Sequence, residues 1–159
     1  MKLEIDGWKS RIRFSASHIV PTSEKCERLH GHDYAVHAKV KGEPDSTGMI
    51  MDFTILKRAL REVVEELDHR VLLPAKSPHM KIEEGESIRV TVGEKSYSLP
   101  PEDVRILDMV ATSAEHIAQY ILRRLTEVID LPANVRKVKI GVDEGPGQGA
   151  WASMNCKPA

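Results

Sequence analysis

The sequence predicts an α+β fold, in which antiparallel strands and long helices share one chain. Segments near both ends alternate polar and apolar residues, as the strands of a half-buried sheet do. Two segments between them carry apolar residues at helical spacing. A shorter stretch has two alternating runs joined by a glycine, which is the pattern of a hairpin. The expected order is therefore strand, strand, helix, hairpin, helix, strand.

The first two strands are expected at residues 8–18 and 32–42. "WKSRIRFSASH" alternates polar and apolar side chains, and "HDYAVHAKVKG" has the same two-residue period. The apolar face of the second strand carries Tyr34, Val36, Ala38 and Val40, and His32 joins it by parity. We expect a loop between the two strands, with Pro21 and the pair Thr22-Ser23 as breakers.

Two helices and a closing strand are expected downstream. Asp52 is placed to cap a helix over 53–67, "FTILKRALREVVEEL". A second helix is expected over 112–129, where Thr112 and Glu115 have the spacing of a capping box. "NVRKVKIGVDE", residues 134–144, alternates again and predicts the last strand.

Residues 74–108 interrupt this plan and predict a peripheral insert. "SIRVTV" and "SYSL" flank a glycine turn and indicate a small hairpin. We therefore expect one domain over residues 1–159, with an antiparallel four-stranded sheet, two helices on one face and the extra hairpin insert. Such a sheet leaves its other face bare, and a homo-oligomer is the usual way to cover it.

Composition excludes several classes of protein. The 159 residues are 41% apolar and 30% charged with a formal net charge of −1, which is a globular composition without a basic excess. We therefore expect no nucleic-acid partner and no membrane partner. Apolar runs stay far below the ~20 residues of a membrane span, and the N-terminus lacks a signal-peptide core. The two cysteines form no disulfide framework, so the cytoplasm is the expected location.

A histidine cluster predicts a metal site. His30 and His32 project from one face of an extended backbone, and Gly31 between them leaves space. His18 is the best third ligand, because it ends the preceding strand and an antiparallel partner would place it near His32. Three histidines with an open fourth position form a common catalytic zinc arrangement.

Cys26 leaves two interpretations open. Lys25 and Arg28 stand near it, and cationic neighbours with a nearby metal favour a reactive thiolate. The spacing Cys26-x3-His30-x-His32 also allows a closed, structural zinc with Cys26 as fourth ligand.

The pair Asp68-His69 is also open to two interpretations. A histidine at the end of a helix is favoured as the cation by the helix dipole. A carboxylate beside a histidine also suits proton relay, because the acid can hold the imidazole in one tautomer and orientation.

Taken together, these segments resemble the 6-pyruvoyltetrahydropterin synthase family. The matching pieces are "FSASH" (14–18), "CERLHGHDY" (26–34), "GMIMDF" (48–53), "LDHRVL" (67–72), "TSAEHIA" (112–118) and "VDE" (142–144). They run almost end to end, and the hairpin insert is the main departure. The resemblance implies the tunnelling fold, in which trimers close their sheets into a barrel, two trimers commonly stack, and active sites lie at subunit boundaries.

The resemblance also implies roles for the site residues. His18, His30 and His32 would bind zinc, Cys26 would be the catalytic thiolate, and Asp68 with His69 would relay protons from a neighbouring subunit. Glu144 would anchor the pterin ring, and Ser113 would contact it through its hydroxyl. The chain departs from many members at Ala114, where a second hydroxyl is common.

Within the family, the compact Cys-x3-His-Gly-His loop looks like the 6-carboxytetrahydropterin synthases of queuosine and archaeosine biosynthesis. Their substrate is 7,8-dihydroneopterin triphosphate. A related subfamily uses a glutamate three residues before the His-Gly-His to release 6-hydroxymethyldihydropterin, and Glu27 occupies that place here, so the chain could be bifunctional or Glu27 could be a solvated acid. The alternatives are 6-pyruvoyltetrahydropterin synthase itself and a non-enzymatic zinc-binding domain, against which the set Cys26, Asp68, His69 and Glu144 argues.

Overall fold

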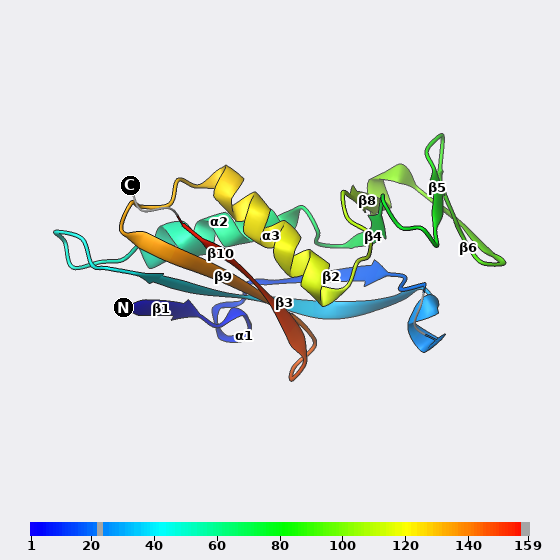
Figure 1. The fold of residues 1–159 in the computed structure, drawn as a ribbon. Helices are drawn as coiled ribbons and strands as arrows, with labels where there is room; N and C mark the ends of the chain where they lie inside the picture. Colours follow the sequence, from blue (N-terminus) through cyan, green and yellow to red (C-terminus); the bar gives the residue numbers. More distant parts are fainter. Residues whose placement is uncertain (22–23, 157–159) are drawn as a thin grey trace.

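A seven-stranded mixed sheet forms the body of the molecule in the computed structural model, which describes residues 1–21 and 24–156 (Figure 1). The strands are β1 (Lys2–Ile5), β2 (Arg13–His18), β3 (His30–Gly42), β4 (Arg70–Pro74), β8 (Val104–Leu107), β9 (Val135–Glu144) and β10 (Gly149–Asn155). Their order is β10-β9-β3-β2-β4-β8, and β1 pairs with the distal part of the long strand β3. The breakers expected at Thr22 and Ser23 lie outside the described residues.

Two long helices cover one face of this sheet, as the sequence predicts (Figure 1). They are α2 (Phe53–Glu65) and α3 (Ala114–Val128). The apolar stripe of each helix packs against the alternating residues of β3 and β9 in one core cluster. The Asp52 side chain accepts the Thr54 N–H at 2.6 Å, which confirms the expected cap of α2. No helix among the described residues has the length and apolar character needed to cross a membrane.

The start of the second long helix differs from the expected capping box. The cap residue is Ser113, and no side-chain hydrogen bond closes the cap. Thr112 lies one residue earlier and is fully buried; its hydroxyl has no hydrogen-bond partner among the described residues. Its carbonyl oxygen instead contacts the His18 ring at 2.7 Å. The position of Thr112 is therefore set by the histidine cluster rather than by the helix.

The sheet is larger than the four antiparallel strands that the sequence predicts. Strands β2, β3, β9 and β10 are antiparallel neighbours, but β1 pairs with the same edge of β3 as β2 does, and β4 and β8 extend the sheet beyond β2 in parallel. The expected first strand is also shorter, because residues 7–10 form the short helix α1 (Gly7–Ser10), capped by Asp6. Gly7 lies so close to β3 that a Cβ atom there would stand 2.4 Å from the Val36 carbonyl oxygen. That close approach favours a glycine-led turn over a continued strand.

The insert forms a small sheet of its own at one end of the molecule (Figure 1). It contains β5 (Lys81–Glu83), β6 (Ile88–Val92) and β7 (Lys95–Leu99). The β6–β7 hairpin turns at Gly93, whose φ of 57° is accessible to glycine, so the predicted hairpin is confirmed and β5 is an addition to it. Its inner face packs on Ile19 and Leu73 of the main body in a second apolar cluster. A 3-10 helix, η2 (Pro101–Asp103), leads back to β8.

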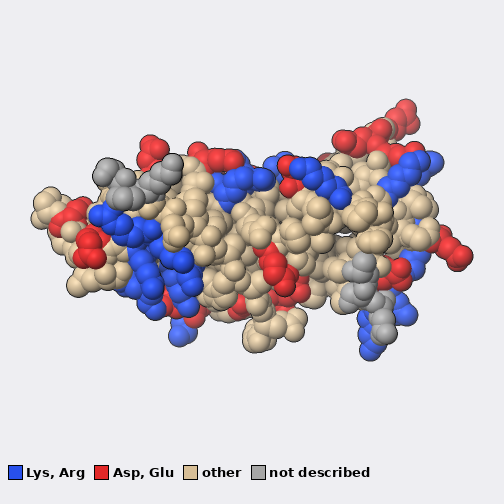
Figure 2. Space-filling model, in the orientation of Figure 1, with Lys and Arg blue, Asp and Glu red and all other residues tan. Residues whose placement is uncertain are grey.

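The face of the sheet opposite α2 and α3 is rich in lysine. Lys39 stands across from Lys139 and Lys41 from Lys137 in the β3–β9 register, and Lys2 of β1 stands across from Lys41. Figure 2 shows Lys and Arg side chains gathered over the half of the sheet that holds β1. Like charges opposite one another in a sheet repel. Within one chain, Glu4 offsets part of this repulsion, because its carboxylate contacts Lys2 at 2.7 Å and Lys39 at 3.3 Å.

Candidate metal centre and active site

The register between β2 and β3 brings the three predicted histidines together. His18 pairs directly with His30, and not with His32 as the sequence suggested, because β3 begins two residues earlier than expected. The Nε2 atoms of His18 and His30 are 3.1 Å apart. One ring nitrogen from each of the three histidines lies within 4.8 Å of the other two. Alternation along the strands therefore gathers all three imidazoles on the helix-covered face.

Hydrogen bonds at the rear of two rings orient them toward this common point. His18 Nδ1 donates to the Thr112 carbonyl oxygen and His30 Nδ1 to the Arg28 carbonyl oxygen, each at 2.7 Å. A proton on Nδ1 leaves Nε2 free as an electron-pair donor, which is how metal-ligating histidines are commonly held. Three such imidazoles suit a divalent ion such as zinc. The residues present thus fit a metal site.

Burial keeps His18 uncharged. Its side chain is only 1% exposed, and desolvation lowers its pKa to about 4, with the neighbouring His30 and His32 rings acting in the same direction. A neutral imidazole is the form that binds metal. Gly31 makes the close packing possible, because a Cβ atom there would stand 3.1 Å from the Ala16 carbonyl oxygen.

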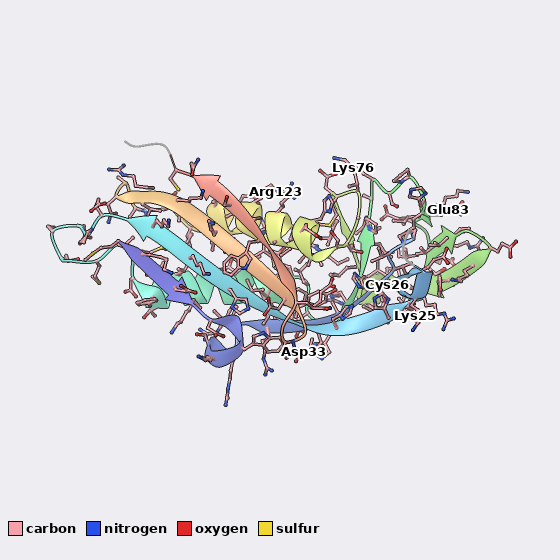
Figure 3. All side chains as sticks on the ribbon, turned by 60° about the horizontal axis from the view of Figure 1, so that its bottom comes forward. Lys25, Cys26, Asp33, Lys76, Glu83 and Arg123 are labelled. Carbon is pink, nitrogen blue, oxygen red and sulfur yellow. The ribbon has the colours of Figure 1, made fainter. Side chains whose placement is uncertain are left out.

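A cavity of about 360 Å³ opens beside the three histidines. Cys26, Ser113 and Glu144, all named from the sequence, line it together with Ala114. Cys26 sits in the 3-10 helix η1 (Glu24–Glu27), and its carbonyl oxygen accepts the Val20 N–H at 2.8 Å. Figure 3 shows Cys26 at the end of the sheet that carries the insert. The cavity therefore unites a thiol, a carboxylate and the imidazole cluster.

Glu144 ends β9 at the inner wall of this cavity. It pairs with Tyr34 in the β3–β9 register and is half-buried. Burial raises the pKa of Glu144, and the charge of Glu115 adds to this, while His32 and His30 oppose it. A carboxylate with a raised pKa gains from a ligand that donates hydrogen bonds to it.

Two further polar residues line the cavity and were not predicted from the sequence as site residues. Glu115 is in the first turn of α3, two residues after Ser113. Gln148 lies in the turn between β9 and β10, where Gly145 and Gly147 have φ values of 81° and 98°. The glycine-rich stretch "GPGQG" after Glu144 was the available signal for this turn. It folds β10 back along β9 and so places Gln148 beside Glu144.

Asp68 and His69 lie elsewhere. The His69 ring nitrogen contacts the Asp68 carboxylate at 2.8 Å, yet the His69 side chain is 83% exposed. His69 lines a second cavity, of about 570 Å³, together with Ser15 and Asp33, and His32 of the histidine cluster borders both cavities. Ser15 and Asp33 alternate with the histidine-bearing positions of β2 and β3, so most of this cavity lies on the other face of the sheet. Neither Asp68 nor His69 lines the cavity that Cys26 and Glu144 share with the three histidines.

Glu27 also points away from the histidine cavity. The two residues were expected to lie in an extended loop, but Cys26 and Glu27 belong to the turn of η1. The Glu27 carboxylate contacts the Lys95 ammonium of the insert at 3.5 Å, and Glu27 does not line the cavity. The structure thus separates the two adjacent acid–base candidates.

The fold and the site together define an α+β enzyme with a histidine cluster suited to a metal. The family model described as 6-pyruvoyl tetrahydropterin synthase matches residues 8–155. The chain belongs to this family of lyases.

Relatives and solved structures agree with this membership. A protein of Methanocaldococcus jannaschii, provisionally named a 6-carboxy-5,6,7,8-tetrahydropterin synthase, is 34% identical over 94% of each chain. A Pyrococcus abyssi protein with the same provisional name is 35% identical over 91% of this chain and 88% of its own. A Plasmodium vivax 6-pyruvoyltetrahydropterin synthase, solved as a variant with its catalytic glutamate replaced by cysteine, superposes with a TM-score of 0.91 at 31% identity over 98% of each chain.

Proposed function

We propose that the protein is a zinc-dependent 6-carboxy-5,6,7,8-tetrahydropterin synthase that acts on 7,8-dihydroneopterin triphosphate in deazaguanine biosynthesis, the route to queuosine and archaeosine. The observation that carries the proposal is the position of Cys26, whose side chain lines the cavity of the three histidines while Glu27 turns away. The provisional names of the archaeal relatives support the same activity.

His18, His30 and His32 would hold the zinc ion, which would supply Lewis-acid polarisation of the substrate side chain. Glu144 would bind the pterin, because a carboxylate can accept both the 2-amino and the adjacent ring N–H. The Ser113 hydroxyl lies on the same cavity wall and would contact the ring. These groups orient the substrate with its side chain toward the histidines.

The reaction needs a base and an acid on the two sides of the substrate. Cys26 as thiolate would take a proton from the polarised side chain, and the Asp68–His69 pair would return one. The overall conversion consumes water and yields 6-carboxytetrahydropterin, acetaldehyde and triphosphate. No external oxidant or reductant is required, because one side-chain carbon is oxidised while the ring is reduced.

A homo-oligomer, trimer or hexamer, would complete the site. His69 is exposed and lies mostly on the sheet face opposite the histidine cluster, so in this proposal the Asp68–His69 pair would serve the metal cluster of a neighbouring subunit. The exposure of the His69 side chain in one chain supports this arrangement, since a relay group works inside an enclosed site.

A second activity has support of its own. The Plasmodium vivax enzyme has a glutamate as a catalytic residue, and a Pyrococcus furiosus relative, 36% identical over 60% of this chain, is named a dihydroneopterin monophosphate aldolase. The alternative activity is therefore the release of 6-hydroxymethyldihydropterin through Glu27, or the formation of 6-pyruvoyltetrahydropterin.

Product analysis tests the proposal. We expect the zinc-loaded protein to convert dihydroneopterin triphosphate mainly to 6-carboxytetrahydropterin, identified by mass spectrometry. The Cys26→Ala variant should keep its zinc and lose this product by about 10²- to 10⁴-fold, the usual contribution of an acid–base group. Cys156→Ala, which removes the other thiol, is the matched control and should leave the rate unchanged.

Two outcomes would contradict this reading. Formation of another pterin as the main product would assign the alternative activity. Loss of zinc from Cys26→Ala would instead favour a closed, four-coordinate structural site, in which the thiol is a ligand.

A further inference from the structure

Two adjacent acid–base candidates point in different directions in the 3-10 helix η1. Such a helix has three residues per turn, so neighbouring side chains diverge by roughly 120°. Cys26 faces the histidine cavity, while Glu27 reaches Lys95 of β7, with an N–O distance of 3.5 Å. A rotation of η1 by about one third of a turn would exchange the two.

The partner of Glu27 is held in place by the insert. Lys95 opens β7, which pairs with β6 in the hairpin. The apolar face of β6 packs on Ile19, the residue that follows the metal ligand His18, and Ile19 is only 2% exposed. The position of the Lys95 backbone is therefore fixed relative to the metal cluster by a packed apolar contact rather than by a free loop.

The same segment also ties Cys26 to the cluster. The Val20 N–H, two residues beyond His18, donates to the Cys26 carbonyl oxygen at 2.8 Å. That bond restrains the backbone of η1 in the orientation that turns Cys26 toward the cavity, and the Glu27–Lys95 ion pair supports the same orientation. Lys95 is the one ion-pair partner that Glu27 has within the described ranges 1–21 and 24–156.

We infer that Lys95 is a positioning residue that selects the reaction: by holding Glu27 outside the cavity it keeps Cys26 facing the substrate. This inference rests on the proposed function. With the ion pair formed, Cys26 supports the route to 6-carboxytetrahydropterin. Without it, only the Val20–Cys26 hydrogen bond opposes rotation of η1, and Glu27 enters the cavity in place of Cys26 in a larger share of the molecules.

The chemistry of the second route is balanced without any added reactant. A base takes the proton of the second side-chain hydroxyl, and the bond between the two hydroxyl-bearing carbons breaks. Its electron pair passes into the pterin and is reprotonated. The products are 6-hydroxymethyldihydropterin and a two-carbon aldehyde that keeps the triphosphate. The ratio of the two pterin products therefore reports which side chain faces the substrate.

Charge reversal at Lys95 is the test. Lys95→Glu should repel Glu27 and raise the ratio of 6-hydroxymethyl to 6-carboxy product by about 3- to 10-fold, the range open to a partly exposed ion pair and its reversal. Both side chains are partly exposed, 43% for Lys95 and 41% for Glu27, which limits the effect. The matched control is Lys81→Glu on β5 of the same small sheet. The Lys81 ammonium contacts Glu83 at 2.9 Å, so this substitution reverses a charge in a similar ion pair and should leave the product ratio unchanged.

A second background separates positioning from general damage. In Glu27→Gln protein, Lys95→Glu should no longer raise the 6-hydroxymethyl product, because the group it releases is absent. An equal rise in both backgrounds would overturn the inference. Lys95→Arg, which keeps the charge, should restore the wild-type ratio.

Thiol alkylation gives a readout that does not depend on catalysis. If Glu27 replaces Cys26 in the cavity, Cys26 becomes more accessible, and its rate of modification by iodoacetamide should rise several-fold in Lys95→Glu. Cys156 in the same protein is the internal reference. An unchanged Cys26 rate overturns the positioning role whatever the products are, whereas an absence of any pterin product from wild-type protein overturns the proposed function instead.

Discussion

His18 and His69 each have a ring nitrogen in contact with a fixed oxygen, but one side chain is buried and the other is exposed. On the helix-covered face, His18 is 1% exposed and its ring is oriented by the Thr112 carbonyl oxygen. On the other face, the His69 side chain is 83% exposed, although it too contacts a fixed partner, the Asp68 carboxylate. The comparison teaches that the β2–β3 register of one chain gathers the histidine cluster completely, whereas the same chain orients the Asp68–His69 pair but does not enclose it.

The Asp68–His69 pair is nonetheless held in place by hydrogen bonds to the backbone of Ser15. Asp68 accepts the Ser15 N–H at 2.8 Å, and the His69 N–H donates to the Ser15 carbonyl oxygen at 2.7 Å. His69 also has a φ of 55°, a left-handed conformation that is uncommon for a residue with a side chain. Backbone strain of this kind is found where the surrounding structure imposes a functional orientation. The Asp68–His69 pair is therefore fixed in orientation although the His69 side chain is exposed.

Removal of one histidine of the cluster should abolish metal binding. His30→Ala is expected to reduce bound zinc from about one ion per chain to almost none and to abolish product formation, because two imidazoles are too few for a stable site. The fold should persist, since His30 is not part of the apolar core. Metal analysis by mass spectrometry checks this, with the exposed His79→Ala as control. Full zinc occupancy in His30→Ala would show that the ligand assignment is wrong.

Co-expression of two inactive variants tests whether Cys26 and His69 of different subunits form one active site. Cys26→Ala damages the cavity face and His69→Ala the relay face, so each alone should be inactive. If the faces of different subunits meet, co-expression of the two variants at equal levels should restore activity at roughly a quarter of the sites. A mixture of the separately purified variants is the control. If co-expressed protein is no more active than that mixture, each site is built from one chain.

The smallest effect concerns stability and pH. Burial alone would raise the pKa of Asp68, but the hydrogen bonds from Ser15 and His69 outweigh it and hold that pKa below the ordinary 3.8. A lowered folded-state pKa stabilises the protein above pH 3.8, and this stabilisation is lost as the pH falls through the folded-state value. Asp68→Asn should therefore cost about 0.5 to 1 kcal/mol at pH 7, discounted for partial exposure.

Denaturant unfolding at fixed protein concentration measures this cost at pH 7 and below pH 3.8. The difference between wild type and Asp68→Asn should shrink at the acidic end, and the exposed Asp130→Asn is the control. A difference that stays constant with pH would mean that the charge of Asp68 contributes nothing to stability.

Much of the metal cluster could be predicted because it depends on local periodicity. Two-residue alternation is a property of any strand, so His30 and His32 had to share a face, and a short antiparallel connection had to return His18 to them. The roles of Glu115, Gln148 and Lys95 could not be predicted in this way. Their places depend on contacts between segments far apart in the chain, which periodicity does not report.

The fold shows the same division. The helices α2 and α3 and the β6–β7 hairpin were predicted, because each carries a long repeat or a glycine turn. The short strands β1, β4 and β8 were missed, and so was the seven-residue strand β10, which follows the strand predicted to be the last. Four- and five-residue segments such as Val104–Leu107 are too short for a period, and β4 and β8 form strands only because they pair in parallel with remote neighbours.

The parallel pairing of β4 with β8 also brings the two ends of the segment 76–107 close together in space. The Ala75 N–H donates to the Leu107 carbonyl oxygen at 2.9 Å, so the chain leaves the body and returns to it at nearly the same point. A deletion that joined residue 75 directly to residue 108 would need no spanning linker, but it would remove the edge strand β8 together with the small sheet. Such a deletion would still uncover Ile19 and Leu73, which the insert now buries. The segment 76–107 could therefore be deleted without a new linker, but its loss would expose an apolar patch beside the metal cluster.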